Sequence, residues 1–235
     1  MPDSALIVGI MEHVRKAFHV AEGAEISMEA NPGTVTREKL TDYRRAGINR
    51  LSFGLQSAND RELKLLGRIH TWAEFLESFH LARECGFTNI NIDLMSALPG
   101  QTRESWKDTL KRVTDLNPEH ISAYSLIIED GTPFGEKYGS EEGRKLLPDE
   151  DSEREMYHET KRFLRDCGYE RYEISNYAKP GRACRHNIGY WTGLPYLGLG
   201  LGASSYMDGC RFAVNSDMKQ YLEEKPGMFT DVEKL

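Results

Sequence analysis

The feature that most constrains the fold of this chain is the alternation of strand and helix patterns over residues 1–126. Short apolar runs that stop at turn residues are typical of strands, and between them lie longer segments with apolar residues at helical spacing. Most of these segments begin at Thr or Asn, whose side-chain oxygens cap helices. We predict strands over 25–29, 50–55, 88–95 and 120–126, and helices over 6–18, 36–46, 59–67, 71–84 and 102–116.

Strands that alternate with helices predict a parallel sheet covered by helices, either as an open sheet or as part of a barrel. We expect an α/β fold that forms part of a TIM-like barrel, because polar residues fall at the carboxyl ends of the strands, where barrel enzymes place their sites. These residues are Glu29, Gln56, Asp93 and Ser125. Exposure to solvent alone also favours polar residues at strand ends, so their position by itself leaves a functional and a non-functional explanation open.

The pattern changes after residue 130. A polar loop is followed by a long predicted helix that begins at Asp149 or Ser152 and ends at Asp166, and then by a glycine- and aromatic-rich region. We therefore divide the chain into a partial barrel over 1–130 and an appended α+β region over 131–235.

Charge and hydropathy argue against nucleic-acid and membrane partners. Lys and Arg total 30 against 37 Asp and Glu, and no segment concentrates positive charge. No apolar stretch approaches the ~18 residues of a membrane span, and the opening residues lack the basic start and cleavage site of a signal peptide. The cysteines, Cys85, Cys167, Cys184 and Cys210, are too widely spaced for a thiolate metal site. We expect a cytoplasmic protein with reduced cysteines and no metal site of its own.

The strand-end residues suggest a ligand of mixed chemistry. Two carboxylates, Glu29 and Asp93, join the amide of Gln56 and the guanidinium of Arg68, which lies at the end of the next predicted helix. Carboxylates bind ammonium groups or ribose hydroxyls and arginine binds carboxylates, so an amino acid joined to a nucleoside fits this set. Alternatively, Arg68 is a solvated residue that interacts favourably with a helix terminus.

The stretch HNIGYW, residues 186–191, places a potential iron ligand beside two large aromatic residues. His186 could ligate haem iron while Tyr190 and Trp191 cover part of the macrocycle. The alternative is a histidine bonded to a neighbouring carbonyl, with both aromatics in the core.

The run GLGLGA, residues 198–203, satisfies the dinucleotide pattern G-x-G-x-x-A only formally, because no strand–helix pattern surrounds it. We interpret it as a strand that another backbone or a flat ligand approaches closely.

Several motifs together resemble one known family. The runs ISMEANPG, RLSFGLQSAN and NIDLMSALPGQT, with the arginine twelve residues after the glutamine, are similar to the radical S-adenosylmethionine family that contains the oxygen-independent coproporphyrinogen III oxidases and the HemW haem chaperones. The match extends from about Glu25 to Asp208. The resemblance implies that S-adenosylmethionine contacts the side chains of Glu29, Gln56, Arg68 and Asp93.

Within this family the HNIGYW stretch resembles the HemW branch, as do YEISNYAKPG before it and YLGLGLGASS after it. This resemblance implies a haem-binding and delivery protein that passes haem to an acceptor protein, with haem contacted by His186, Asn187, Tyr190 and Trp191. The alternative, supported by the shared cofactor motifs alone, is an oxidase that decarboxylates the porphyrinogen coproporphyrinogen III.

The chain departs from the family pattern at one end of the barrel. It has neither the C-x-x-x-C-x-x-C loop that holds the family's [4Fe-4S] cluster nor the G-G-T-P segment, and its first predicted strand corresponds to the family's third. We expect a fragment whose full-length parent alone carries the cluster, and we predict that this chain does not cleave S-adenosylmethionine reductively. An open sheet edge would also favour self-association.

Overall fold

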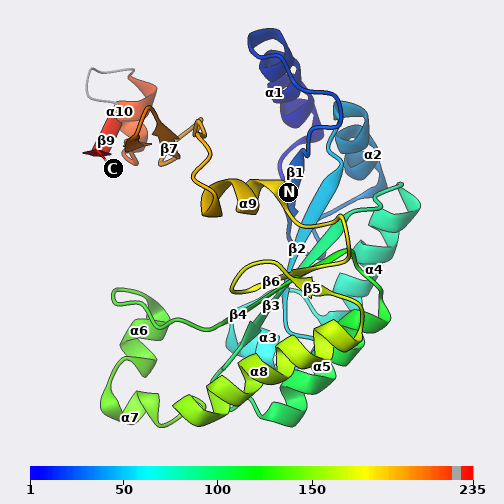
Figure 1. Cartoon of the computed structure of the whole chain (residues 1–235), viewed down its shortest axis with the longest axis vertical. Coiled ribbons are helices and arrows are strands. Elements are labelled where there is room, and N and C mark those ends of the chain that lie inside the picture. Colours follow the sequence, from blue (N-terminus) through cyan, green and yellow to red (C-terminus); the bar gives the residue numbers. More distant parts are fainter. Residues whose placement is uncertain (224–228, 235) are drawn as a thin grey trace. The chain divides into compact units, whose positions relative to one another are not determined.

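A six-stranded sheet with the strand order β1-β2-β3-β4-β6-β5 organises the first part of the chain (Figure 1). The computed structural model describes residues 1–223 and 229–234. The first four strands are parallel, whereas β6 pairs antiparallel with β4, and β5 pairs antiparallel with β6. The predicted α/β fold with parallel strands is confirmed. The strands are β1 Ser27–Ala30, β2 Arg50–Gln56, β3 Ile90–Ser96, β4 His120–Ser125, β5 Glu170–Arg171 and β6 Asn176–Ala178.

Helices connect the parallel strands and lie together along one face of the sheet (Figure 1). Thr36, Thr71 and Thr102 cap three of them through their side chains, and Thr71 forms a reciprocal capping box with Glu74. The predicted bounds of the elements up to residue 126 differ from those observed by at most two residues. The helices are α1 Ser4–Ala17, α2 Arg37–Ala46, α3 Asp60–Leu65, α4 Trp72–Glu84, α5 Arg103–Asp115, α6 Pro133–Tyr138, α7 Glu141–Arg144 and α8 Glu150–Asp166.

The segment between β4 and α8, expected to be a polar loop, contains the short helices α6 and α7. Thr132 caps α6 by accepting a hydrogen bond from the backbone of Gly135, and Pro133 occupies the first turn, where its missing N–H is not needed. Ser140 caps α7 in the same way. The prediction was wrong here because helices this short are set by their caps and carry little apolar periodicity.

The core lies between the sheet and its helices. Leu51 and Phe53 of β2 and Ile90 and Ile92 of β3 are fully buried on this side of the sheet. Further out, Trp106 of α5 packs in the core, and its indole Nε1 donates a hydrogen bond to the Thr160 hydroxyl of α8 at 2.8 Å. This contact fixes α8 against α5.

The opposite face of the same strands is polar. In the parallel register Ser52 pairs with Asn91, Asn91 with His120, and Asp93 with Ser122. Since side chains alternate between the two faces of a strand, these residues share the face away from Leu51 and Phe53. The polar face is therefore the place in this sheet where a polar ligand can bind.

The chain divides into two compact units, Met1–Ala183 and Cys184–Leu235. The second unit contains a three-stranded antiparallel sheet of order β7-β8-β9. The division expected from the sequence, between residues 130 and 131, stays a prediction. The elements of the second unit are α9 Arg185–Trp191, β7 Ser204–Met207, β8 Cys210–Val214, α10 Met218–Leu222 and β9 Phe229–Lys234.

The segment 198–203 does not form the strand that its alternating glycines suggested. Gly200 and Gly202 have φ values of 107° and 70°, which turn the chain instead of extending it. The expected close approach of another backbone is nevertheless found at Gly198, where a Cβ atom would lie 2.2 Å from the carbonyl oxygen of Ser204.

Strand β1 forms one edge of the six-stranded sheet. The self-association expected from an open edge stays a prediction.

Among the described residues, no helix is both long enough and apolar enough to span a membrane.

Candidate functional site at the strand ends

The structure places the four predicted ligand residues on β1, β2, β3 and the segment after α3. Glu29 is exposed on β1, and Gln56, only 4% exposed, is the last residue of β2. Asp93 is half-buried in the middle of β3, not at the strand end where the sequence suggested it would lie. Arg68 is half-buried and follows the last turn of α3.

The backbone at Gln56 adopts an unusual conformation. Its φ of 74° lies in the left-handed region, and the register between β2 and β3 shifts between Phe53 and Gln56. Such a bulge re-aims the side chain that follows it. Next to it, the buried His70 ring lies 3.3 Å from the Leu55 carbonyl oxygen, and burial lowers the pKa of His70. The neutral ring can thus donate to this carbonyl and help to hold the bulge.

The Asp93 carboxylate accepts hydrogen bonds from its neighbours on the polar face. Asn91 donates from Nδ2 to Asp93 Oδ1 at 2.7 Å, and the Ser52 hydroxyl donates to Oδ2 at 3.0 Å. Burial raises the pKa of Asp93, while hydrogen bonds from Asn91, Ser122 and Ser52 act in the opposite direction. The carboxylate is therefore oriented but costly to ionise, which favours a cationic or hydrogen-bond-donating partner.

The hydrogen bonds continue from Asn91 across the sheet. Asn91 Oδ1 lies 2.5 Å from His120 Nδ1, and His120 Nε2 lies 2.8 Å from the Tyr172 hydroxyl. Burial, together with the nearby positive charge of Arg50, lowers the pKa of His120 to about 3, so this histidine is neutral at pH 7. Because an amide oxygen only accepts, His120 carries its proton on Nδ1 and accepts from Tyr172 at Nε2. The network thereby fixes the orientation of Asn91 and, through it, of Asp93.

Tyr124 of β4 contacts Gln56, one of the four predicted residues, and was not predicted from the sequence. Its hydroxyl donates to Gln56 Oε1 at 2.9 Å. Burial and then the charge of Asp93 raise the pKa of Tyr124, with Glu29 acting in the same direction and Arg68 in the opposite one. Gln56 thus contacts this phenol directly, whereas the charges of Glu29, Arg68 and Asp93 influence its pKa. In the sequence, a place near the strand end favoured the next residue, Ser125, whereas the alternation of His120, Ser122 and Tyr124 along β4 was the signal that pointed to Tyr124.

This donor set fits S-adenosylmethionine. Two carboxylates, a guanidinium and a fixed amide match the ammonium, carboxylate and hydroxyl groups of an amino acid joined to a nucleoside. Gly54 leaves space beside the amide, since a Cβ atom there would lie 3.3 Å from Gln56 Nε2. The residues do not fit an iron–sulfur cluster, because within the part of the chain that the structure describes no three His, Cys, Asp or Glu side chains gather as metal ligands.

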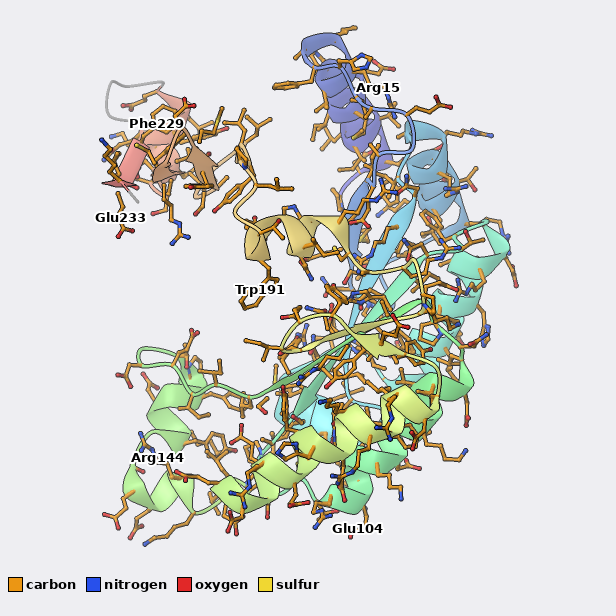
Figure 2. The ribbon with its side chains drawn as sticks, in the orientation of Figure 1. Arg15, Glu104, Arg144, Trp191, Phe229 and Glu233 are labelled. Atoms are coloured by element: carbon orange, nitrogen blue, oxygen red, sulfur yellow. The ribbon has the colours of Figure 1, made fainter. Side chains whose placement is uncertain are left out.

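The HNIGYW stretch forms helix α9 of the second unit. The rings of His186 and Tyr190, one helical turn apart, are in edge-to-face contact, with 4.6 Å between their centroids. Asn187 and Trp191 are likewise one turn apart and lie next to them on the helix. Tyr190 is 49% and Trp191 61% exposed, and Trp191 extends from the last turn of α9 (Figure 2). Both aromatic residues therefore lie outside the core, whereas the alternative explanation of HNIGYW placed them inside it. An accessible imidazole beside exposed aromatic rings fits a flat ligand that contains iron.

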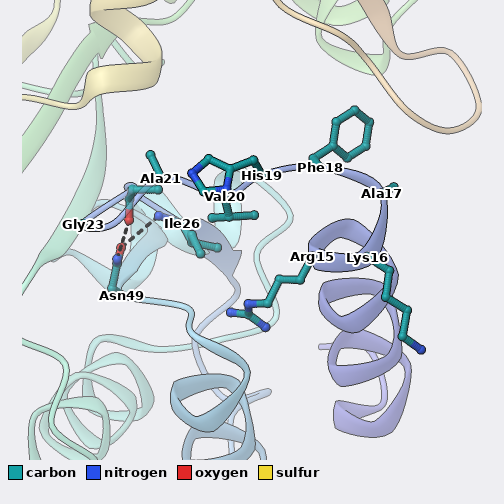
Figure 3. A pocket seen from close by; sticks show the side chains of 11 residues that line it. Arg15, Lys16, Ala17, Phe18, His19, Val20, Ala21, Gly23, Ile26 and Asn49 are labelled. Atoms are coloured by element: carbon teal, nitrogen blue, oxygen red, sulfur yellow. Dashed lines mark hydrogen bonds between the residues drawn. The ribbon is translucent and has the colours of Figure 1, made fainter.

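A separate hollow of about 720 Å³ lies at the other end of the strands (Figure 3). It is lined by the last turn of α1, the loop that follows, and Ile26 and Asn49, which directly precede β1 and β2. Because none of the predicted ligand residues lines this hollow, we do not assign the ligand to it.

Comparison with known proteins shows which family matches. Residues 4–113 match the family described as the radical SAM superfamily. The chain is 42% identical over 194 residues to the protein named heme chaperone HemW of Escherichia coli, an alignment that covers 83% of this chain and 50% of that protein. It is 40% identical over 200 residues to the heme chaperone HemW of Bacillus subtilis, with 85% of this chain and 52% of that protein covered. The chain thus spans about half the length of these curated relatives.

A solved structure supports the same grouping. Coproporphyrinogen III oxidase (HemN) from Escherichia coli, described as a radical SAM enzyme, superposes with a TM-score of 0.81 at 27% sequence identity. The superposition covers 100% of this chain and 57% of that one. Sequence identity is therefore higher to the haem chaperones than to this oxidase.

Proposed function

Because the chain belongs to the radical SAM superfamily, we propose that it is part of a haem-binding and delivery protein that also holds S-adenosylmethionine at the strand ends of its parallel sheet. The observation that carries this proposal is its 42% identity to a protein named as a haem chaperone, an alignment that covers 83% of the chain. We also propose that haem passes to an acceptor protein in the cytoplasm.

For S-adenosylmethionine, the proposed roles follow from the chemistry of each side chain. The carboxylates of Glu29 and Asp93 accept hydrogen bonds from ammonium or ribose hydroxyl groups, and Arg68 pairs with a carboxylate. The Gln56 amide donates through Nε2. These residues bind and orient the ligand. That this chain does not cleave S-adenosylmethionine reductively stays a prediction.

For haem, we propose binding at α9. His186 supplies the imidazole, and Tyr190 and Trp191 supply aromatic surface for the macrocycle, with Asn187 in the adjacent row. Haem is the transported ligand in this scheme. The runner-up function is that of an oxygen-independent coproporphyrinogen III oxidase, which the structural similarity to the oxidase favours.

Parallel titrations with haem and with coproporphyrin III, each followed by the Soret absorbance, test the proposed function. Coproporphyrin III carries four carboxylates and no iron, so it reports an oxidase-type pocket and offers nothing for His186 to ligate. We expect haem to bind stoichiometrically and at least about tenfold more tightly than coproporphyrin III. Equal or tighter binding of coproporphyrin III would favour the oxidase and count against haem delivery.

A further inference from the structure

We propose that Tyr124 is a positioning residue for S-adenosylmethionine, because its hydroxyl fixes the Gln56 amide in the orientation that offers the amino group to the ligand. The inference rests on the proposed S-adenosylmethionine site and adds a residue that none of the sequence motifs indicated.

Tyr124 lies on the polar face of the sheet. It pairs in register with Met95, two residues after the pair formed by Asp93 and Ser122, so its side chain shares their face. The ring is half-buried, and its hydroxyl donates to Gln56 Oε1 at 2.9 Å, which is ordinary hydrogen-bond geometry. Burial and then Asp93 raise the pKa of Tyr124, and these effects outweigh the opposite influence of the Gln56 hydrogen bond and of Arg68, so the phenol stays protonated at neutral pH and able to donate.

The Gln56 amide needs an external group to orient it. Its oxygen and nitrogen have nearly the same shape, so a rotation by half a turn exchanges a hydrogen-bond acceptor for a donor. The bond from Tyr124 engages the oxygen. Within residues 1–223 and 229–234 no hydrogen-bond partner is found for Gln56 Nε2, which lies beside Gly54, where there is no side chain. The amino group is consequently the part of Gln56 left to donate to a ligand.

The bulge at Gln56 makes this support more important. A residue in the left-handed region with a shifted register is not held by regular strand pairing on its own. Tyr124 comes from a different strand and spans β3 to reach Gln56. Loss of its hydroxyl would therefore release the amide while the packing of the ring remains.

A double-mutant cycle with S-adenosylmethionine binding, measured calorimetrically, tests the inference. Tyr124→Phe removes one neutral hydrogen bond and is expected to weaken binding about three- to tenfold. In a Gln56→Ala background the same substitution is expected to have no further effect, because Tyr124 acts through that amide. Tyr43→Phe is the matched control: Tyr43 donates to the Pro2 carbonyl at 2.8 Å from α2, so its loss should leave the affinity unchanged.

The side-chain amide signals of Gln56, recorded by NMR without ligand, separate the positioning role from the proposed site. We expect Tyr124→Phe to move these signals while those of Gln101, whose amide donates to Glu62 at 2.9 Å, stay in place. Unchanged Gln56 signals, or an equal loss of affinity in both backgrounds, would overturn the role of Tyr124 even though the chain binds S-adenosylmethionine. Failure of the unaltered chain to bind it would overturn the proposed site and this inference together.

Discussion

Replacing Trp106 with alanine is expected to lower the free energy of unfolding by about 3–5 kcal/mol, the range for removing a fully buried aromatic side chain. Trp106 is 1% exposed, and its indole both fills the space between α5 and α8 and donates to Thr160. The substitution leaves a cavity and removes the hydrogen bond that the Thr160 hydroxyl accepts, and relaxation of the two helices cannot fully repair this loss. Urea denaturation followed by far-ultraviolet circular dichroism measures the loss.

Trp191→Ala is the matched control for this experiment. Trp191 is 61% exposed, so its removal should change the free energy of unfolding by no more than about 0.5 kcal/mol. A Trp106 variant as stable as the Trp191 variant would show that α8 does not depend on α5 for its packing.

Replacing Asp93 with asparagine is expected to weaken S-adenosylmethionine binding about 10- to 100-fold without destabilising the fold. The loss of affinity follows from removing a charged acceptor, whose hydrogen bonds are stronger than neutral ones. Asparagine can keep the existing contacts, since its oxygen accepts from Asn91 and its nitrogen can donate to the Ser52 hydroxyl.

The expected effect of Asp93→Asn on the free energy of unfolding follows from the raised pKa of Asp93. A carboxyl group whose pKa is higher in the folded state than in the unfolded chain favours folding when protonated and opposes it when ionised. At neutral pH the neutral asparagine removes that cost, so the free energy of unfolding should stay constant or rise. Asp115→Asn, at an exposed ion pair with Lys111, is the control and should leave the affinity unchanged. Loss of both affinity and stability in the Asp93 variant would instead assign Asp93 a structural role.

Local signals in the sequence were sufficient for most of the fold in the first unit. Thr36, Thr71 and Thr102 begin helices where their capping side chains predict, and the apolar runs of β2 and β3 form the core side of the sheet. These features depend on residues close together in the chain, which is why they can be read without a structure.

The features that the sequence did not reveal depend on contacts between distant residues. The bond between Tyr124 and Gln56 joins β4 to the bulged end of β2, and no local pattern marks it. Helix α9 was not predicted, because it has only seven residues and contains Gly189, a poor helix former. The turn at Gly200 was mistaken for a strand because alternating residues suit either conformation until φ is known.

The most direct test of the central claim is a haem titration of the unaltered chain and of His186→Ala, followed by the Soret band. We expect a stoichiometric shift in the unaltered chain that is lost in the variant, since His186 offers an exposed imidazole next to the ring of Tyr190. His158→Ala provides the control, because this exposed histidine of α8 also contacts a tyrosine ring, that of Tyr157, and should bind haem as the unaltered chain does. A shift that persists unchanged in His186→Ala, or no shift in the unaltered chain, would contradict haem binding at α9.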